Sequence, residues 1–308
     1  MNKIAIVFPG QGSQFVGMMK DFYSAFPEIR PLYQQASEVL GYDLYQICVE
    51  GPEDKLGRTE VTQPAVLVAG YAIWQIVKSR FIGADLVMAG HSLGEYTALA
   101  CSEAIAFRDA VSLVQYRGSL MQNAVPEGQG SMAAVLGLDD STVEKVCKKI
   151  MDVHGGVVEP VNYNAPGQVV IAGEKELIEK AVIQLKESGA KRALPLAVSV
   201  PAHCSLMKAA ASELSKRLSQ TELKMPIYPV VQNVDAEVQM DVNLIRQKLV
   251  LQLHSPVQWT KSVLAIADMR VEKMIECGPG KVLTSLNKRI SQKLECSSLG
   301  DIEKVKNI

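Results

Sequence analysis

The feature that most constrains this chain is the pentapeptide Gly90-His91-Ser92-Leu93-Gly94, which fits the pattern G-x-S-x-G. The apolar residues 86–89 before it predict a short buried strand, and residues 95–106 after it predict a helix. In that setting the serine lies on a sharp strand-to-helix turn that exposes its hydroxyl at one end of a sheet. The flanking glycines permit the strained backbone and the close approach of strand and helix. The pattern therefore predicts a nucleophilic serine on an α/β fold.

Short apolar runs alternate with helical stretches around this turn. Before residue 125 we expect, in chain order, the strand 4–8, the helix 18–40, the helix 63–78, the strand 86–89 with its helix, and the helix 108–124. Pro27 and Pro31 mark a break in the first helix, whereas Pro64 is expected in the first turn of the second, where proline is tolerated. This order is typical of a parallel sheet covered by helices.

The sequence pattern changes after a connector at residues 125–130 that is rich in glycine and proline. The elements expected next are the strand 131–137, the helix 141–151, the strands 157–163 and 168–172, the helix 174–187 and the strand 190–198. The order β-α-β-β-α-β is that of a ferredoxin-like unit. We therefore expect a large α/β domain with a parallel sheet, formed by residues 1–127 and 199–308, and a small ferredoxin-like subdomain inserted at 128–198. The chain then returns to the large domain as a predicted helix at 201–218, and a further strand is expected at 273–277.

The composition excludes several classes of protein. With 308 residues, 48% of them hydrophobic, and a formal net charge of −1, the chain fits a globular protein with a large core and no nucleic-acid partner. No stretch reaches the ~18 apolar residues of a membrane helix, and the N-terminus lacks the features of a signal peptide, so no membrane association is expected. Six scattered cysteines without a C-x-x-C pair predict neither a metal site nor disulfides, and they favour a cytoplasmic location. The glycine-rich turn at 10–14 lacks the Gly-Lys-Ser/Thr of a phosphate loop, and no cofactor is expected.

A nucleophilic serine needs a general base, and the chain has four histidines. His203 is the best candidate, because it is predicted to open a helix where the chain leaves the small subdomain, at the lip of a cleft between the domains. His91 adjoins the serine, but a neighbour in a tight turn usually points away from it. His154 lies in a predicted surface turn, and His254 remains an alternative base.

The sequence offers less direct evidence for the other groups that an acyl-serine enzyme needs. No aspartate or glutamate is an obvious partner for the base, so a main-chain carbonyl or an amide side chain could hold the imidazole tautomer, with Gln252 as a candidate. The N–H of Leu93, at a helix N-terminus directly after the nucleophile, is the expected first donor to the oxyanion. The turn after the first strand should lie at the same end of a parallel sheet, so the N–H of Gln11 could be the second donor.

Arg117 is the remaining candidate, and it lies in the predicted helix 108–124. Most helical arginines are solvated. If Arg117 instead points into the cleft, its planar fork would hold a carboxylate in two parallel hydrogen bonds. The substrate would then be a dicarboxylic half-thioester or half-ester.

A series of motifs in chain order carries a resemblance to a known family. They are Gly10-Gln11-Gly12-Ser13-Gln14, residues 90–96 (GHSLGEY), Arg117-Gly118, Asn162-Tyr163-Asn164 with Pro166-Gly167-Gln168, Val200-Pro201-Ala202-His203, Pro256-Val257-Gln258-Trp259 and Gly278-Pro279-Gly280. They span nearly the whole chain. On these motifs the chain resembles the malonyl-CoA:acyl carrier protein transacylases, the stand-alone bacterial enzymes of type II fatty acid synthesis.

The resemblance implies an α/β-hydrolase-like large domain with a ferredoxin-like insertion. It implies Ser92 as the nucleophile and His203 as the base, with the N–H groups of Gln11 and Leu93 as oxyanion donors. It further implies two supporting residues. Arg117 would pair with the free carboxylate of the malonyl group, and the carbonyl of Gln252 would orient the base.

The same resemblance implies malonyl-CoA and a phosphopantetheine-bearing, acidic acyl carrier protein as partners, and we expect a monomer. The docking surface for that carrier should be basic, with Lys191, Arg192, Lys288 and Arg289 as candidates. The chain departs from the family at Ala202, where most members have serine, and at His254-Ser255, where most have Tyr-Asn. Both departures look peripheral to the site.

Three other functions use the same residues. An esterase-like hydrolase could use the same serine and base, and would release free malonate without an acceptor thiol. A polyketide-type acyltransferase that loads methylmalonyl would carry the same motifs. A binding module with a vestigial site is the third alternative, and the intact serine, histidine and arginine argue against it.

Overall fold

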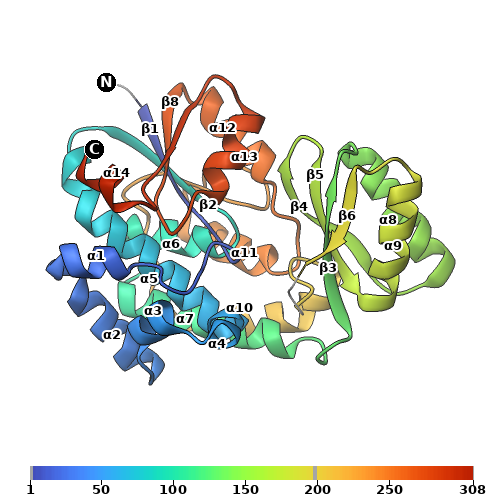
Figure 1. Cartoon of the computed structure of the whole chain (residues 1–308), viewed down its shortest axis with the longest axis horizontal. Helices are drawn as coiled ribbons and strands as arrows, with labels where there is room; N and C mark the ends of the chain where they lie inside the picture. Colours follow the sequence, from blue (N-terminus) through green and yellow to red (C-terminus); the bar gives the residue numbers. More distant parts are fainter. Residues whose placement is uncertain (1–2, 197–199, 308) are drawn as a thin grey trace.

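The computed structural model describes residues 3–196 and 200–307, which form a larger and a smaller part (Figure 1). The larger part is built on a five-stranded sheet in the order β7-β2-β1-β8-β9, in which all neighbouring strands are parallel. Its strands are β1 (Lys3–Phe8), β2 (Asp85–Gly90), β7 (Val230–Val231), β8 (Val271–Glu276) and β9 (Glu295–Ser298). The parallel sheet expected from the alternating pattern is confirmed.

Both faces of this sheet are buried. Along β1, Ile6 and Phe8 pack into one hydrophobic cluster, whereas Ala5 and Val7 pack into another. Successive side chains of a strand point to opposite faces, so the continuous apolar run of β1 serves two cores at once. The sheet is therefore covered by helices on both sides, and its strand ends are where polar groups can gather.

The helices of the larger part cover these two faces (Figure 1). They are α1 (Lys20–Ala25), α2 (Arg30–Leu40), α3 (Leu44–Glu50), α4 (Glu53–Gly57), α5 (Thr59–Val77), α6 (Leu93–Cys101), α7 (Phe107–Asn123), α10 (Lys208–Gln220), α11 (Val242–Gln252), α12 (Trp259–Asp268), α13 (Val282–Ile290) and α14 (Ile302–Lys306), with the 3-10 turns η1 (Pro27–Ile29), η2 (Lys78–Phe81) and η3 (Ser205–Met207). None of the helices in the described residues is both long and apolar enough to cross a lipid bilayer.

The smaller part is a four-stranded antiparallel sheet in the order β4-β5-β3-β6. Its elements are β3 (Gly130–Leu136), α8 (Asp140–His154), β4 (Val158–Ala165), β5 (Gln168–Glu174), α9 (Lys175–Glu187) and β6 (Arg192–Pro195). A third hydrophobic cluster lies between this sheet and the two helices. The connectivity and strand order are those of a ferredoxin-like unit, as the sequence predicts.

Several predicted boundaries are wrong. Helix α5 begins at Thr59, so Pro64 lies in its second turn and removes a backbone hydrogen bond there, within a helix that is buried on almost every side. The first predicted helix is interrupted before Pro27, while Pro31 is accommodated in the first turn of α2. Strand β6 is shorter than predicted, and the predicted residues 197 and 198 lie outside the described residues.

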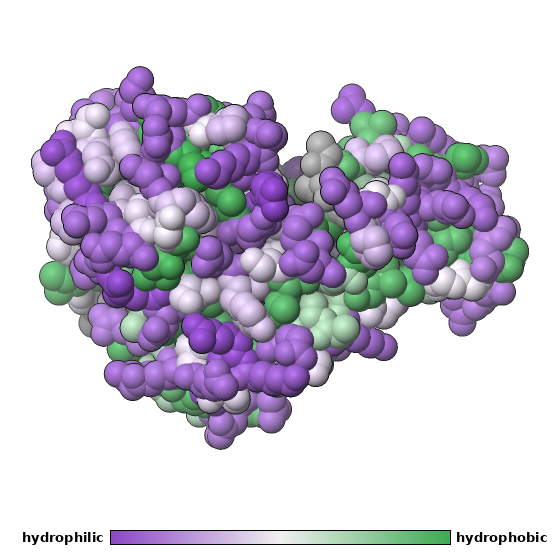
Figure 2. Space-filling model, turned by 90° about the horizontal axis from the view of Figure 1, so that it is seen from below, coloured by the Kyte–Doolittle hydropathy of each residue, from purple (hydrophilic) through white to green (hydrophobic). Residues whose placement is uncertain are grey.

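The two parts meet along β4. The Tyr163 N–H donates to the carbonyl of Val257 at 3.0 Å, and the Val257 N–H donates to the carbonyl of Val161 at 2.9 Å. The chain just before α12 thus pairs with a strand of the smaller sheet. In the space-filling view the smaller part projects from the larger body, and mostly hydrophilic residues cover this face (Figure 2).

Candidate active site

Ser92 lies on the sharp turn between β2 and α6. Its backbone has φ 52° and ψ −107°, a left-handed conformation that is strained for a residue with a side chain. A Cβ added to Gly90 would lie 1.9 Å from the carbonyl carbon of Gly94, and one added to Gly94 would lie 2.0 Å from the oxygen of Phe8. The two glycines of the motif are therefore required by the close approach of β1, β2 and α6. This packing holds the Ser92 hydroxyl at the carboxyl end of the sheet.

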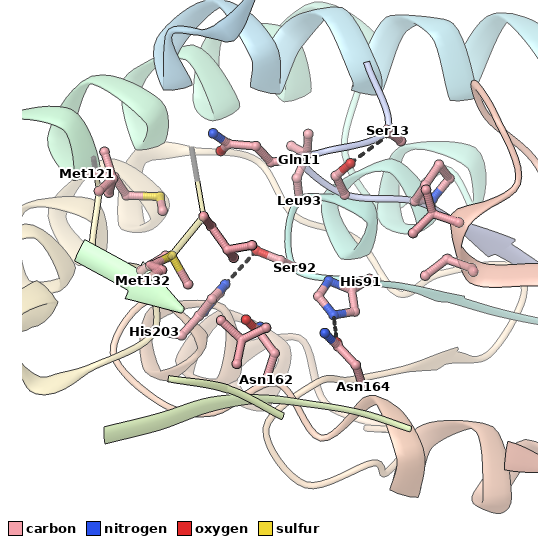
Figure 3. A pocket seen from close by; sticks show the side chains of 18 of the residues that line it. Gln11, Ser13, His91, Ser92, Leu93, Met121, Met132, Asn162, Asn164 and His203 are labelled. Atoms are coloured by element: carbon pink, nitrogen blue, oxygen red, sulfur yellow. Dashed lines mark hydrogen bonds between the residues drawn. The ribbon is translucent and has the colours of Figure 1, made fainter. Parts of the chain in front are cut away.

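His203 faces this hydroxyl. The Ser92 Oγ lies 2.7 Å from Nε2 of His203 (Figure 3). On the other side of the ring, Nδ1 of His203 lies 2.6 Å from the main-chain oxygen of Gln252. A carbonyl oxygen only accepts, so Nδ1 carries the proton and donates it. Nε2 is then the unprotonated nitrogen, and it accepts from the serine hydroxyl.

The local structure around His203 differs from the prediction. His203 precedes η3 and has φ 64°, so it lies in a left-handed turn rather than opening a helix. Its own N–H donates to the carbonyl of Leu253 at 3.2 Å, which ties the turn to the end of α11. Burial first, and then the positive charge of Arg117, lower the pKa of His203 to about 3. The imidazole is neutral near pH 7 and can accept a proton.

Arg117 points into the site from α7 and is only 1% exposed. Its Nη1 donates to Oε1 of Gln63 at 2.9 Å, and its Nη2 donates to Oε1 of Gln252 at 2.9 Å and to Oγ of Ser92 at 3.2 Å. The guanidinium carbon lies 5.2 Å from the centroid of the Tyr96 ring. Arg117 is therefore not a solvated side chain on the surface of a helix.

This buried cation is held by uncharged groups. Its hydrogen bonds go to amide and hydroxyl oxygens, and its Nε finds no hydrogen-bond partner within residues 3–196 and 200–307. The nearest carboxylate, that of Glu95, is separated from the guanidinium by the Gln252 amide, so no carboxylate contacts this buried cation directly, and pairing with an anion would recover part of its desolvation energy. The guanidinium is thus placed where it could pair with a carboxylate next to Ser92, and its role in substrate recognition remains a prediction.

The two expected oxyanion donors also border the site. Gln11 and Leu93 line the same cavity as Ser92, and Leu93 is the first residue of α6, where helix N–H groups are free. The side chain of Gln11 donates to Oγ1 of Thr59 at 3.4 Å. Their role as oxyanion donors remains a prediction.

The other histidines occupy different places. His91 points away from the nucleophile, with Nε2 2.7 Å from Oδ1 of Asn164 (Figure 3). The centroid of its ring lies 5.7 Å from that of Trp259. His154 is the last residue of α8, an exposed helix end rather than the predicted turn. His254 follows α11, and the structure places His203 at the serine instead.

Two residues at the site escaped the sequence analysis. Asn233 accepts from the N–H of Ser92 with Oδ1 at 2.7 Å and donates to the carbonyl of Gly90 with Nδ2 at 2.7 Å, so it holds both sides of the turn. It lies far along the chain in no motif, and nothing local points to it. Glu95 directly follows the G-x-S-x-G pattern and is fully buried. Its position within residues 90–96, which carry the family resemblance, was the available signal.

These groups open onto a cavity of about 210 Å³ between the two parts. Ser92, His203 and Arg117 lie on one wall, while Met132 and Val170 of the smaller sheet contribute apolar side chains to the other. Within the described part of the chain, no group of His, Cys, Asp and Glu side chains could hold a metal ion. The arrangement can activate a serine for attack on an acyl group that carries a carboxylate.

Comparison with known proteins decides the family. The acyl transferase domain model matches residues 5–304. A malonyl CoA-acyl carrier protein transacylase of Salmonella typhimurium is 50% identical over 301 residues, which cover 98% of this chain and 97% of that protein. The chain belongs to the malonyl CoA-acyl carrier protein transacylases. The family inferred from the sequence motifs is confirmed.

Solved structures of other transacylases agree with this assignment. An acyl carrier protein S-malonyltransferase of Vibrio cholerae superposes with a TM-score of 0.94 at 49% identity, over 99% of both chains. A malonyl-transacylase solved in complex with a type II PKS acyl-carrier protein gives a TM-score of 0.95 at 48% identity, over 99% of this chain and 98% of that one. The predicted fold class is confirmed, and the protein is an acyltransferase.

Proposed function

We propose that this transacylase moves a malonyl group from malonyl-CoA to the phosphopantetheine thiol of acyl carrier protein through a malonyl-Ser92 intermediate. The observation that carries the proposal is the buried guanidinium of Arg117 within hydrogen-bond distance of the Ser92 hydroxyl. This contact supports the proposal, because a cation suited to a carboxylate then lies beside a hydroxyl that is also hydrogen-bonded to the His203 imidazole. The names of the relatives point to the same substrate and acceptor.

In the first half-reaction Ser92 attacks the thioester carbonyl while Nε2 of His203 takes its proton. The N–H groups of Gln11 and Leu93 would donate to the oxyanion that forms. When the carbon–sulfur bond breaks, the proton on Nε2 passes to the departing coenzyme A thiolate. Malonyl-Ser92 and free coenzyme A remain.

The second half-reaction runs the same steps in reverse with a different thiol. The phosphopantetheine thiol of the carrier gives its proton to His203 and attacks malonyl-Ser92, and the proton then returns to Ser92. A thioester and a serine ester differ in free energy by only a few kcal/mol. The main requirement is therefore to keep water away from the acyl-enzyme, which the apolar wall of the cavity favours.

The partner protein, the oligomeric state, the cellular location and the domain bounds are further parts of the proposal. The proposed contacts of an acidic carrier protein are four exposed cations at the start of β6 and the end of α13: Lys191 just before β6, Arg192 at its first position, and Lys288 and Arg289 in the last turn of α13. We propose that the protein works as a monomer in the cytoplasm, where its buried cysteines stay reduced. We also propose residues 128–198 as the ferredoxin-like small subdomain, with 1–127 and 199–308 as the large α/β catalytic domain.

Intact-mass measurement after mixing with malonyl-CoA tests the covalent intermediate. The native protein should gain one malonyl group and lose it on addition of carrier protein, and Ser92→Ala should gain none. Retention of an adduct in Ser92→Ala would place the nucleophile elsewhere. Steady release of malonate without an acceptor thiol would favour a hydrolase, and faster transfer from methylmalonyl-CoA would favour the polyketide-type alternative.

The choice of substrate is tested at Arg117. Arg117→Ala removes the partner of the malonyl carboxylate, and loss of a buried charge-assisted pair costs roughly 2–5 kcal/mol. We expect malonyl transfer to fall by about 30-fold or more, while acetyl transfer from acetyl-CoA holds or rises. Equal losses with both substrates would show that Arg117 does not recognise the carboxylate.

A further inference from the structure

Glu95 is a fully buried carboxylate that the proposed mechanism does not use. Its Oε2 accepts from the main-chain N–H of Asn233 at 2.9 Å and from Nε2 of Gln252 at 3.0 Å, and its Oε1 accepts from Nε2 of Gln232 at 3.3 Å. Burial raises the pKa of Glu95 to about 7, and these hydrogen bonds oppose that rise. A carboxylate that faces three N–H donors is built into the fold as an acceptor.

The Gln252 side chain lies between this carboxylate and Arg117. Its Oε1 accepts from Nη2 of Arg117 at 2.9 Å, while its Nε2 donates to Oε2 of Glu95 at 3.0 Å and to the carbonyl of Ser92 at 3.0 Å. Rotation of the amide by half a turn would set its NH₂ group against the guanidinium and its oxygen against the carboxylate. Both contacts would be repulsive, so only one orientation is stable.

We propose that Glu95 is a positioning residue, which fixes the Gln252 amide and through it holds the guanidinium of Arg117 beside Ser92. The inference rests on the proposed function, because it assumes that Arg117 binds the malonyl carboxylate. Glu95 itself touches neither the nucleophile side chain nor the cavity. Its loss should therefore lower the recognition of a charged acyl group more than the reactivity of the serine.

Two substitutions of Glu95 distinguish the loss of its hydrogen-bond acceptor from the loss of its whole side chain. Glu95→Ala removes one acceptor of the Gln252 amide and leaves it the carbonyl of Ser92 and, at 3.4 Å, Oδ1 of Asn233, so the amide is held less firmly. In Glu95→Gln, a single oxygen at the Oε2 position can still accept from both Asn233 and Gln252. Its new NH₂ group would face Nε2 of Gln232, which donates to Oε1 of Glu95 in the native protein, so the Gln232 amide must turn over to present its Oε1, which is buried and finds no partner among the described residues. Glu95→Gln should therefore restore the hold on the Gln252 amide that Glu95→Ala weakens.

The readout is the ratio of two rates on the same protein. One is the rate of Ser92 malonylation by malonyl-CoA, and the other is the rate of Ser92 labelling by a neutral alkyl fluorophosphonate, which carries no carboxylate. We expect Glu95→Ala to lower the ratio by about tenfold or more, the equivalent of one lost charge-assisted hydrogen bond. Glu95→Gln should stay within about threefold of the native ratio.

A matched control exists at Glu276, another buried glutamate, which accepts from the N–H groups of Leu283 and Thr284 at the start of α13. Glu276→Ala should lower the melting temperature and leave the ratio unchanged. If Glu95→Ala behaves in the same way, or if Glu95→Gln falls as far as Glu95→Ala, the proposal is overturned. Should Glu95→Ala not fold, Glu95→Asp withdraws the acceptor by one methylene group, and an unchanged ratio there would equally overturn it.

The same two rates, measured for Arg117→Ala, separate the proposed role of Arg117 from that of Glu95. If it leaves the ratio unchanged, the proposed recognition of the malonyl carboxylate fails. If it lowers the ratio while the Glu95 variants do not, only the inference about Glu95 fails.

Discussion

His203 and Arg117 are a base and a cation placed in one buried site. A positive charge near an imidazole disfavours its protonated form, and burial acts in the same direction. The free enzyme therefore holds a base that is ready to accept the serine proton, and the cation serves two purposes. In the proposed function it attracts the carboxylate of the substrate, and it adds to the effect of burial in keeping the imidazole neutral.

The proximity of Arg117 to His203 predicts an unusual pH dependence for the reactivity of Ser92. Since the pKa of His203 is lowered to about 3, the second-order rate of labelling by a neutral fluorophosphonate should be flat from about pH 5.5 to 7.5, with no inflection near the ordinary histidine value of about 6.5. In Arg117→Ala the pKa of His203 should rise, because a repelling charge is gone, and the acid limb should move toward neutral pH. An inflection in the labelling rate near pH 6.5 in the native protein would contradict the prediction. Circular dichroism over the same pH range is the control that the fold stays intact.

At the scale of elements, the turn between β2 and α6 is the part of the site that the sequence predicts best. It depends on residues adjacent in the chain, and the glycine spacing alone indicates how strand and helix meet. Arg117 and Gln252 could be named as candidates, but not their shared hydrogen bond. Asn233 could not be found, because its contact with Ser92 exists only once β7 lies beside β2. The left-handed turn at His203 could not be predicted either, because its N–H donates to the carbonyl of Leu253, a residue far along the chain at the end of α11.

Gly90 tests how tightly this turn is packed. The Cβ of Gly90→Ala would lie 1.9 Å from the carbonyl carbon and 2.0 Å from the oxygen of Gly94, and backbone cannot yield as a side chain can. We expect a loss of stability of about 3 kcal/mol or more, or failure to fold, measured by urea unfolding. Gly57→Ala is the matched control, because a Cβ there meets nothing within 4 Å and the residue ends a helix. A native-like midpoint for Gly90→Ala would show that β2 and α6 can separate without penalty.

At the scale of the whole molecule, the site depends on how the smaller sheet is attached to the larger part. Glu159 of β4 accepts from the N–H and the hydroxyl of Ser205, both at 2.8 Å. Ser205 begins η3, just after His203. The same strand β4 also pairs with the backbone at Val257. One strand therefore connects the apolar wall of the cavity to the segment that carries the base.

Glu159→Ala should weaken this connection. It leaves the Ser205 N–H without its acceptor, so we expect a loss of about 1–3 kcal/mol in the free energy of unfolding. The more informative change is in the acyl-enzyme, because a looser wall admits water to malonyl-Ser92. We expect the adduct to decay several-fold faster without an acceptor thiol, followed by intact mass. Glu144→Ala is the control, since Glu144 accepts from the Tyr163 hydroxyl at 2.7 Å within the smaller part. If the two variants lose the malonyl group at equal rates, the contact between Glu159 and Ser205 does not control the access of water. The protection of the intermediate would then come from the larger part alone.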